Sequence, residues 1–253
     1  MEEKILYFDT ETTDIQSKDI VQIAIIKDSG ETLNMYFKPV QKVSYSAMAV
    51  HHLTPEFLDR YELFENAKLP KDFKDPEFNG KDLKEYLDYL SKEYIWVAHN
   101  IEFDEEVLRK KGITLKKKIC TFKLARNMFD EDGMDIESYS LQYLRYYLGL
   151  YKNENKEHNT AHDALSDVYF LKDLFEYIKK NSKFTLEQMM QITREPAYIR
   201  SINFGKYAGR KLIDVAREDR EYLEWLKENL TDKDDLMWNI DRVLYMGGGT
   251  LFD

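Results

Sequence analysis

The order of its strand-like and helix-like segments is the feature that most restricts which fold this chain can adopt. Apolar runs of strand length cover residues 4–8, 20–27, 34–38, 94–98 and 118–120. The turn Asp28-Ser29-Gly30 separates the second run from the third, and short turns of this kind favour antiparallel neighbours. Helical patterns are expected over residues 82–92, 102–111, 121–129, 139–148 and 164–180. This order predicts an α/β fold in which a mixed sheet is flanked by helices.

A domain boundary is expected after the last of these helices. The polar stretch Lys179-Lys180-Asn181-Ser182 follows it directly. The chain has 253 residues, which is room for one large domain or for a medium domain with a small one. We therefore expect an α/β domain over residues 1–182 and a small, mainly helical C-terminal module over residues 183–253.

Composition excludes several classes of protein. The net charge of −10 argues against a protein that coats nucleic acid by bulk electrostatics, but an enzyme can hold a strand end through metal ions. Cys120 is the only cysteine, so disulfides within the chain and thiolate metal clusters are impossible. No apolar run reaches the roughly 18 residues that cross a bilayer, and the N-terminus lacks the features of a signal peptide. We expect a cytoplasmic protein without a membrane partner.

Acidic residues follow the first strand and the fourth strand-like run. Asp9 and Glu11 are two residues apart, so both carboxylates can face one point in space. Such a pair is costly unless a cation or proton lies between its members, although it can also lie in a solvated turn. Asp104 falls in the first turn of an expected helix, where it can bind a metal or simply compensate the helix dipole.

A third acidic element opens the helix expected over residues 164–180. His162 and Asp167 are five residues apart, which on a helix separates them by about 140°. For both to reach one site, His162 must lie on the preceding loop or in the first turn. Asp163 is a rival ligand, one helical turn from Asp167.

The acidic elements together suggest a metal-dependent hydrolase. The carboxylates of Asp9, Glu11, Asp104 and Asp167 are hard ligands that suit Mg²⁺ or Mn²⁺. Two such ions about 3.5–4 Å apart can stabilise both the attacking and the leaving oxygen in phosphodiester hydrolysis. His162, with an unperturbed pKa near 6.5, could take the proton of the attacking water.

Three motifs carry a resemblance to a known family. Phe8-Asp9-Thr10-Glu11-Thr12-Thr13, His99-Asn100-Ile101-Glu102-Phe103-Asp104 and His162 with Asp167 resemble the exonuclease motifs of the DEDDh branch of the DnaQ-like 3'–5' exonucleases. The resemblance implies a ribonuclease H-like fold. It also implies two Mg²⁺ ions, replaceable by Mn²⁺, on Asp9, Glu11, Asp104 and Asp167, with His162 as general base. Asp14 departs from the pattern, in which glycine is common at this position.

A wider resemblance points to the exodeoxyribonuclease X group of that branch. It includes residues 47–54, 119–126, 187–229 and, within them, the motif Phe204-Gly205-Lys206-Tyr207-Ala208-Gly209. Residues 60–80 look like an insertion. The resemblance implies that nucleotides are removed from the 3' ends of single-stranded or duplex DNA as 5'-mononucleotides.

The same resemblance suggests residues that contact the substrate. Thr10 and Thr12 could bond to the terminal sugar and phosphate, while Ile15 and Gln16 could press against or between the terminal bases. Ile15 can equally belong to the core. The remaining contacts would come from the second motif, and they are His99, Asn100 and Phe103. Alternatively, His99 and Asn100 could merely cap the helix that follows, and Phe103 could be buried in the core.

Two C-terminal features leave alternatives open. The basic residues between Arg194 and Lys211, interleaved with Phe204 and Tyr207, suit contact with a phosphate backbone, but both aromatic rings can instead belong to the core of the module. The tail that carries Leu251-Phe252 resembles peptides that bind a sliding clamp, or it is a terminal strand or a disordered end.

Three functions compete with a 3'–5' exodeoxyribonuclease. A 3'–5' exoribonuclease would use the same metal site, because that site does not by itself read the 2'-hydroxyl. A proofreading exonuclease subunit would attach to a polymerase or clamp. A catalytically inactive binding or scaffold protein is the third, and the complete set of acidic residues with His162 counts against it.

Overall fold

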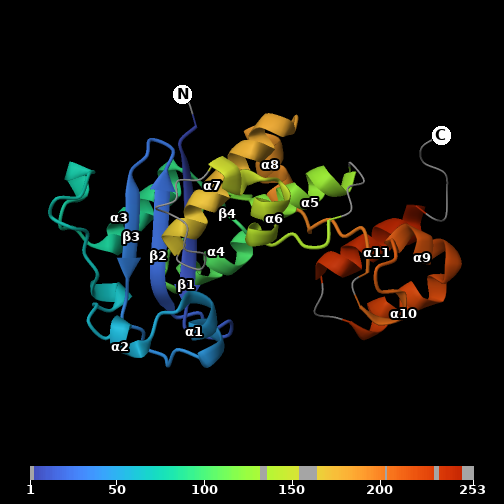
Figure 1. Ribbon diagram of the computed structural model, residues 1–253, viewed down its shortest axis with the longest axis horizontal. Coiled ribbons are helices and arrows are strands. Elements are labelled where there is room, and N and C mark those ends of the chain that lie inside the picture. The colour runs from blue at the N-terminus through green and yellow to red at the C-terminus, as the bar shows by residue number, and fades with distance from the viewer. Residues whose placement is uncertain (1–2, 132–135, 154–163, 203, 231–233, 247–253) are drawn as a thin grey trace. The chain divides into compact units, whose positions relative to one another are not determined.

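The computed structural model describes residues 3–131, 136–153, 164–202, 204–230 and 234–246 (Figure 1). The chain forms two compact units. The first comprises Met1–Phe122 and Ser138–Met190, and the second comprises Lys123–Glu137 and Gln191–Asp253. Among the described residues, no helix is both long and apolar enough to cross a membrane.

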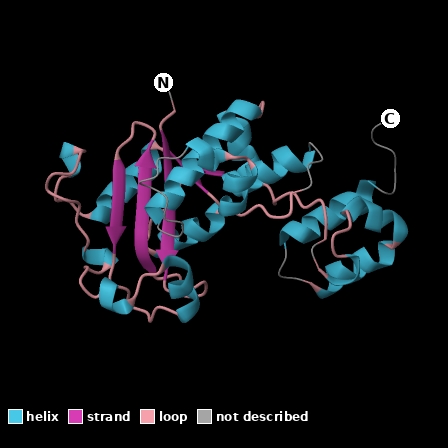
Figure 2. Cartoon of the chain, in the orientation of Figure 1, coloured by secondary structure: helices cyan, strands magenta, loops and turns pink. Residues whose placement is uncertain are grey.

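A mixed sheet forms the centre of the first unit (Figure 2). It has five strands in the order β3-β2-β1-β4-β5. Its strands are β1 (Ile5–Thr12), β2 (Ile20–Lys27), β3 (Thr32–Tyr36), β4 (Ile95–Ala98) and β5 (Lys117–Cys120). The pairs β1–β2 and β2–β3 are antiparallel, whereas β1–β4 and β4–β5 are parallel. The expected mixed sheet is confirmed, with strand ends that differ by a few residues from the predicted ones.

The first unit contains helices that include those expected near residues 82–92, 102–111, 139–148 and 164–180. They are α1 (Tyr45–His51), α2 (Pro55–Leu58), α3 (Leu83–Glu93), α4 (Ile101–Lys110), α6 (Leu141–Tyr147) and α7 (Ala164–Asn181). Two further helices each contribute to both units, and they are α5 (Thr121–Glu131) and α8 (Leu186–Arg194).

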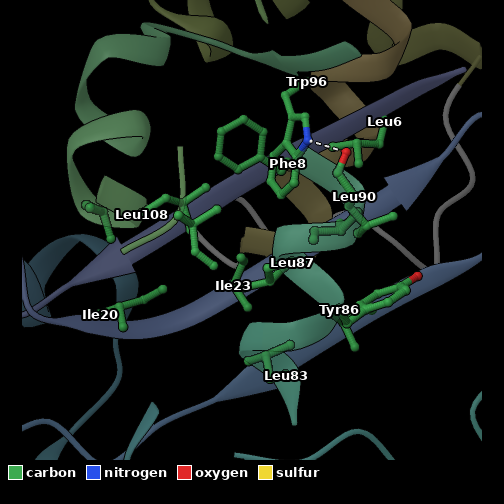
Figure 3. Packing of buried hydrophobic residues seen from close by; sticks show 14 of the residues in the cluster. Leu6, Phe8, Ile20, Ile23, Leu83, Tyr86, Leu87, Leu90, Trp96 and Leu108 are labelled. Atoms are coloured by element: carbon green, nitrogen blue, oxygen red, sulfur yellow. Dashed lines mark hydrogen bonds between the residues drawn. The ribbon is translucent and has the colours of Figure 1, made fainter. Parts of the chain in front are cut away.

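Alternation along β1 divides its side chains between two layers. Leu6 and Phe8 join the core cluster that includes Leu87 and Leu90 of α3, as Figure 3 shows. Tyr7 lies between them in the sequence and points to the opposite face of the sheet. Its ring packs edge-on against that of Phe175 of α7, with 5.7 Å between the ring centroids. The odd-numbered residues of β1 therefore share the face that α7 covers.

Fully buried aromatic rings hold the α3 layer against the sheet. Trp96 of β4 lies edge-on to Phe8, with ring centroids 4.8 Å apart, and its indole Nε1 donates to the Leu90 carbonyl oxygen at 3.1 Å (Figure 3). Buried aromatic side chains contribute about 1.5–3 kcal/mol each through removal of apolar surface from water. The bond also satisfies the one polar atom that burial of the indole would leave without a partner.

The second unit has a core of its own. Its helices are α9 (Leu212–Glu218), α10 (Arg220–Asn229) and α11 (Asp234–Met246). Tyr207 is buried in this core, its hydroxyl donates to Asp219 Oδ2 at 2.8 Å, and Phe204 packs against the same cluster. The structure thus favours the core alternative for both rings over contact with nucleic acid.

Candidate metal and nuclease site

Three acidic side chains meet where β1 ends beneath α7. Asp9, Glu11 and Asp167 each offer one carboxylate oxygen, and these oxygens all lie within 4.8 Å of one another. Asp9 and Glu11 belong to the face of β1 that also carries Tyr7. Two sequence segments more than 150 residues apart therefore supply one cluster.

The contact between Tyr7 and Phe175 explains how Asp167 reaches this place. From Tyr7 to Glu11 the strand advances four residues, or about 13 Å. From Phe175 back to Asp167 the helix covers eight residues, or about 12 Å. Because the two lengths match, a helix anchored on Tyr7 through Phe175 brings Asp167 level with the end of β1.

The cluster has the chemistry of a divalent-cation site. Like charges at this separation disfavour ionisation of all three groups unless a cation or a proton lies among them. Carboxylate oxygens are the ligands that hard cations such as Mg²⁺ and Mn²⁺ select. The residues present therefore fit the metal ions that the sequence motifs imply.

Asp104 of α4 lies outside this group of three and has a different environment. It is buried, and its Oδ1 accepts hydrogen bonds from the backbone nitrogen of Thr10 at 3.0 Å and from the Thr10 hydroxyl at 2.6 Å. Burial raises the pKa of Asp104 to about 7, and the two bonds from Thr10 act in the opposite direction. The strand that carries Asp9 and Glu11 thus holds this fourth carboxylate through the residue between them.

The threonines expected at the substrate are both buried. The hydroxyl of Thr10 is bonded to Asp104, and that of Thr12 donates to the Asp14 carbonyl oxygen at 3.1 Å. Their side chains therefore organise the end of β1. Contact between these threonines and a terminal sugar or phosphate stays a prediction.

Ile15 does not belong to the core, because 75% of its surface is exposed. Asp14 holds the loop that presents it. One carboxylate oxygen accepts from the backbone nitrogens of Gln16 and Ser17, both at 2.7 Å, and the other accepts from the Ser17 hydroxyl. These bonds keep the pKa of Asp14 below its usual range. The aspartate in the usual glycine position thus makes a turn stabilised by its own side chain.

His99 is engaged through both ring nitrogens. Its Nε2 donates to the Tyr139 carbonyl oxygen at 2.8 Å, which leaves Nδ1 to accept from the Thr121 hydroxyl at 2.9 Å. Burial lowers the pKa of His99 to about 4, so the ring is neutral at physiological pH. This bonding favours a structural role for His99 over contact with phosphate.

The other residues expected at the substrate lie near the start of α4. Asn100 is exposed in a left-handed conformation, with φ of 63°, and its side chain makes no capping hydrogen bond. Phe103 is partly buried against the core, and the Lys18 ammonium lies 4.7 Å from its ring centroid. The proposed base His162, the rival ligand Asp163 and the tail with Leu251-Phe252 fall outside the described residues.

Two residues that the motifs do not reveal lie beside Asp167. Gln142 of α6 donates from Nε2 to Asp167 Oδ1 at 2.7 Å, and Arg145 donates to Gln142 Oε1 at 3.0 Å. Neither the spacing nor the composition of α6 signals this contact, because it depends on how α6 packs on α7.

Comparison with known proteins shows the family of this chain. The sequence pattern of the family described as Exonuclease matches residues 6–175, and that of the family described as Exodeoxyribonuclease X-like C-terminal matches residues 202–231. This chain belongs to the exonuclease family. The first match includes Asp9, Glu11 and Asp167, so the acidic cluster lies in the part of the exonuclease that its family shares.

Curated relatives cover most of this exonuclease. Exodeoxyribonuclease 10 of Escherichia coli (strain K12) is 31% identical over 226 residues, which are 88% of this chain and 90% of the relative. DNA polymerase III subunit epsilon of Buchnera aphidicola is 24% identical over 89% of this chain and 98% of the relative.

Solved structures confirm the expected ribonuclease H-like fold. Exonuclease X in complex with 5' overhanging duplex DNA has a TM-score of 0.53 and 28% identity, and the alignment covers 75% of this chain and 99% of that one. An E. coli exonuclease I with an oligonucleotide, at 17% identity and a TM-score of 0.52, shares the fold over 73% of this chain and 42% of that one.

His99 predicts a pH dependence of stability with a definite sign. Its folded-state pKa of about 4 lies below the ~6.5 of an unfolded histidine, so the unfolded chain binds the proton first as the pH falls. The stability that neutral His99 contributes is complete above about pH 6.5 and is lost towards about pH 4. Urea unfolding should show that His99→Gln, which binds no proton, loses less stability than the wild type over this interval. A difference between the two proteins that is constant with pH would contradict this prediction.

Proposed function

We propose that this exonuclease removes nucleotides from the 3' ends of DNA and releases 5'-mononucleotides. The observation that carries the proposal is the cluster of Asp9, Glu11 and Asp167 in a chain of the exonuclease family. DNA as substrate is supported by two relatives, Exodeoxyribonuclease 10 and the Exonuclease X bound to duplex DNA. The 3'–5' direction rests on the resemblance of the three motifs to DEDDh exonucleases.

Two Mg²⁺ ions, replaceable by Mn²⁺, would be held by Asp9, Glu11 and Asp167, with Asp104 as the fourth ligand. Bound there, the ions would neutralise charge on the scissile phosphate and lower the pKa of the attacking water. His162 would accept the proton of that water. Hydrolysis breaks the bond between phosphorus and the 3' oxygen of the preceding nucleotide. The released nucleotide keeps its 5' phosphate, and the shortened strand ends in a 3' hydroxyl.

The proposed domains are an exonuclease domain over residues 1–182 and a C-terminal module over residues 183–253. The two family matches support this division, since one ends at residue 175 and the other begins at residue 202. The compact units of the structure differ from this division, because the second unit also takes in Lys123–Glu137 and begins only at Gln191, so residues 183–190 belong to the first unit.

Cleavage assays with labelled oligonucleotides test the proposed function. Single-stranded DNA labelled at its 5' end, incubated with the protein and Mg²⁺, should give a ladder that shortens from the 3' end. Asp167→Asn, which keeps the size of the side chain but loses its charge, should lower the rate on the order of 10³-fold by weakening metal binding. EDTA should stop the wild-type reaction.

Each other outcome of this assay favours a different function. Degradation of matched RNA alone would keep the site and make the protein an exoribonuclease. Shortening from the 5' end would contradict the proposed direction. No cleavage of either nucleic acid, with or without EDTA, would favour a binding or scaffold role.

The exposed side chain of Ile15 is proposed to press on the terminal base of the substrate. Because it is 75% exposed, Ile15→Ala should change the free energy of unfolding by less than about 0.5 kcal/mol. Loss of an apolar contact with the base of about 1 kcal/mol would raise KM for DNA about five-fold, with kcat little changed. Val50→Ala, at another exposed aliphatic residue, serves as control. Equal KM values for Ile15→Ala and the wild type on single-stranded and duplex ends would remove Ile15 from the substrate site.

A further inference from the structure

Asp167 is held from α6 as well as from its own helix. Gln142, the second residue of α6, donates from Nε2 to Asp167 Oδ1 at 2.7 Å. This donor is neutral, so it binds one oxygen of the carboxylate without cancelling its charge. The side chain therefore constrains the carboxylate while leaving it able to bind a cation.

Arg145 fixes which end of the Gln142 amide faces Asp167. Its guanidinium carries only donors, and its Nη1 bonds to Gln142 Oε1 at 3.0 Å. The amide oxygen must consequently point to Arg145 and the amide nitrogen to Asp167. The ambiguity that usually attends a glutamine side chain is absent here.

The arginine is itself immobilised by α7. Arg145 is 5% exposed, and its guanidinium carbon lies 3.7 Å from the ring centroid of Phe170. Gln142 and Arg145 are three residues apart on α6, as Asp167 and Phe170 are on α7, so each pair shares one helix face. Two consecutive contacts between the helices thus connect a packed ring to the metal-binding carboxylate.

We propose that Gln142 is a positioning residue of the metal site, with Arg145 as the residue that orients it. The inference rests on the proposed function of Asp167 as a metal ligand. Gln142 fixes the plane of the Asp167 carboxylate and so orients it towards a cation shared with Asp9 and Glu11.

Gln142→Met tests this role, since methionine nearly matches glutamine in length but donates no hydrogen bond. Calorimetric titration of the full chain with Mn²⁺, without DNA, should give a Kd about ten-fold higher than that of the wild type. The Tm of the metal-free protein should fall by a few degrees, because the substitution also removes an acceptor of the buried Arg145 guanidinium. At subsaturating Mn²⁺, kcat should fall while KM for DNA is unchanged, and added Mn²⁺ should restore part of the rate.

Two controls separate the possible failures. Tyr147→Phe, at an exposed residue of the same helix, should bind Mn²⁺ as the wild type does. Asp167→Asn should weaken Mn²⁺ binding more than Gln142→Met, and if it does not, the proposed metal site itself is wrong.

Wild-type Mn²⁺ affinity in Gln142→Met, together with weakened binding in Asp167→Asn, overturns the positioning role alone. Should Gln142→Met fail to fold, Gln142→Ala removes the same donor without filling the space. Unchanged Mn²⁺ affinity in a folded Gln142→Ala would overturn the proposal equally.

Discussion

The repulsion among three carboxylates is the constraint on which the rest of this structure depends. Asp9, Glu11 and Asp167 keep oxygens within 4.8 Å of one another, which no isolated peptide segment would maintain. The fold holds them there with buried apolar contacts on both faces of β1. Leu6 and Phe8 pack against the α3 layer, and Tyr7 packs against Phe175 of α7. A divalent cation bound among them would convert this repulsion into attraction.

Uncharged hydrogen-bond donors hold two of the acidic groups. Thr10 bonds to Asp104 through its backbone nitrogen and its hydroxyl, and Gln142 bonds to Asp167 through its amide. All three donors are uncharged. Such donors orient a carboxylate without adding positive charge beside it, and the guanidinium of Arg145 bonds to the Gln142 oxygen. This arrangement suits a site that binds cations and would hinder one that binds anions directly.

Sequence reasoning could predict the parts of the site that depend on local periodicity. The two-residue repeat of a strand places Asp9 beside Glu11, and the helix expected from residue 164 carries Asp167. It could not predict that Gln142 contacts Asp167, since that contact depends on packing between two helices. Nor could it decide whether Ile15 is core or surface, because the exposed turn is made by the unusual Asp14.

Thermal unfolding with and without Mg²⁺ tests the central claim most directly. The account predicts that Mg²⁺ raises the Tm of the wild type, because a ligand that binds only the folded state stabilises it. It also predicts that metal-free Asp9→Asn, with one charge fewer in the cluster, has a higher Tm than the metal-free wild type and responds much less to Mg²⁺. Equal Mg²⁺ stabilisation of both proteins, or a lower metal-free Tm for Asp9→Asn, would contradict it.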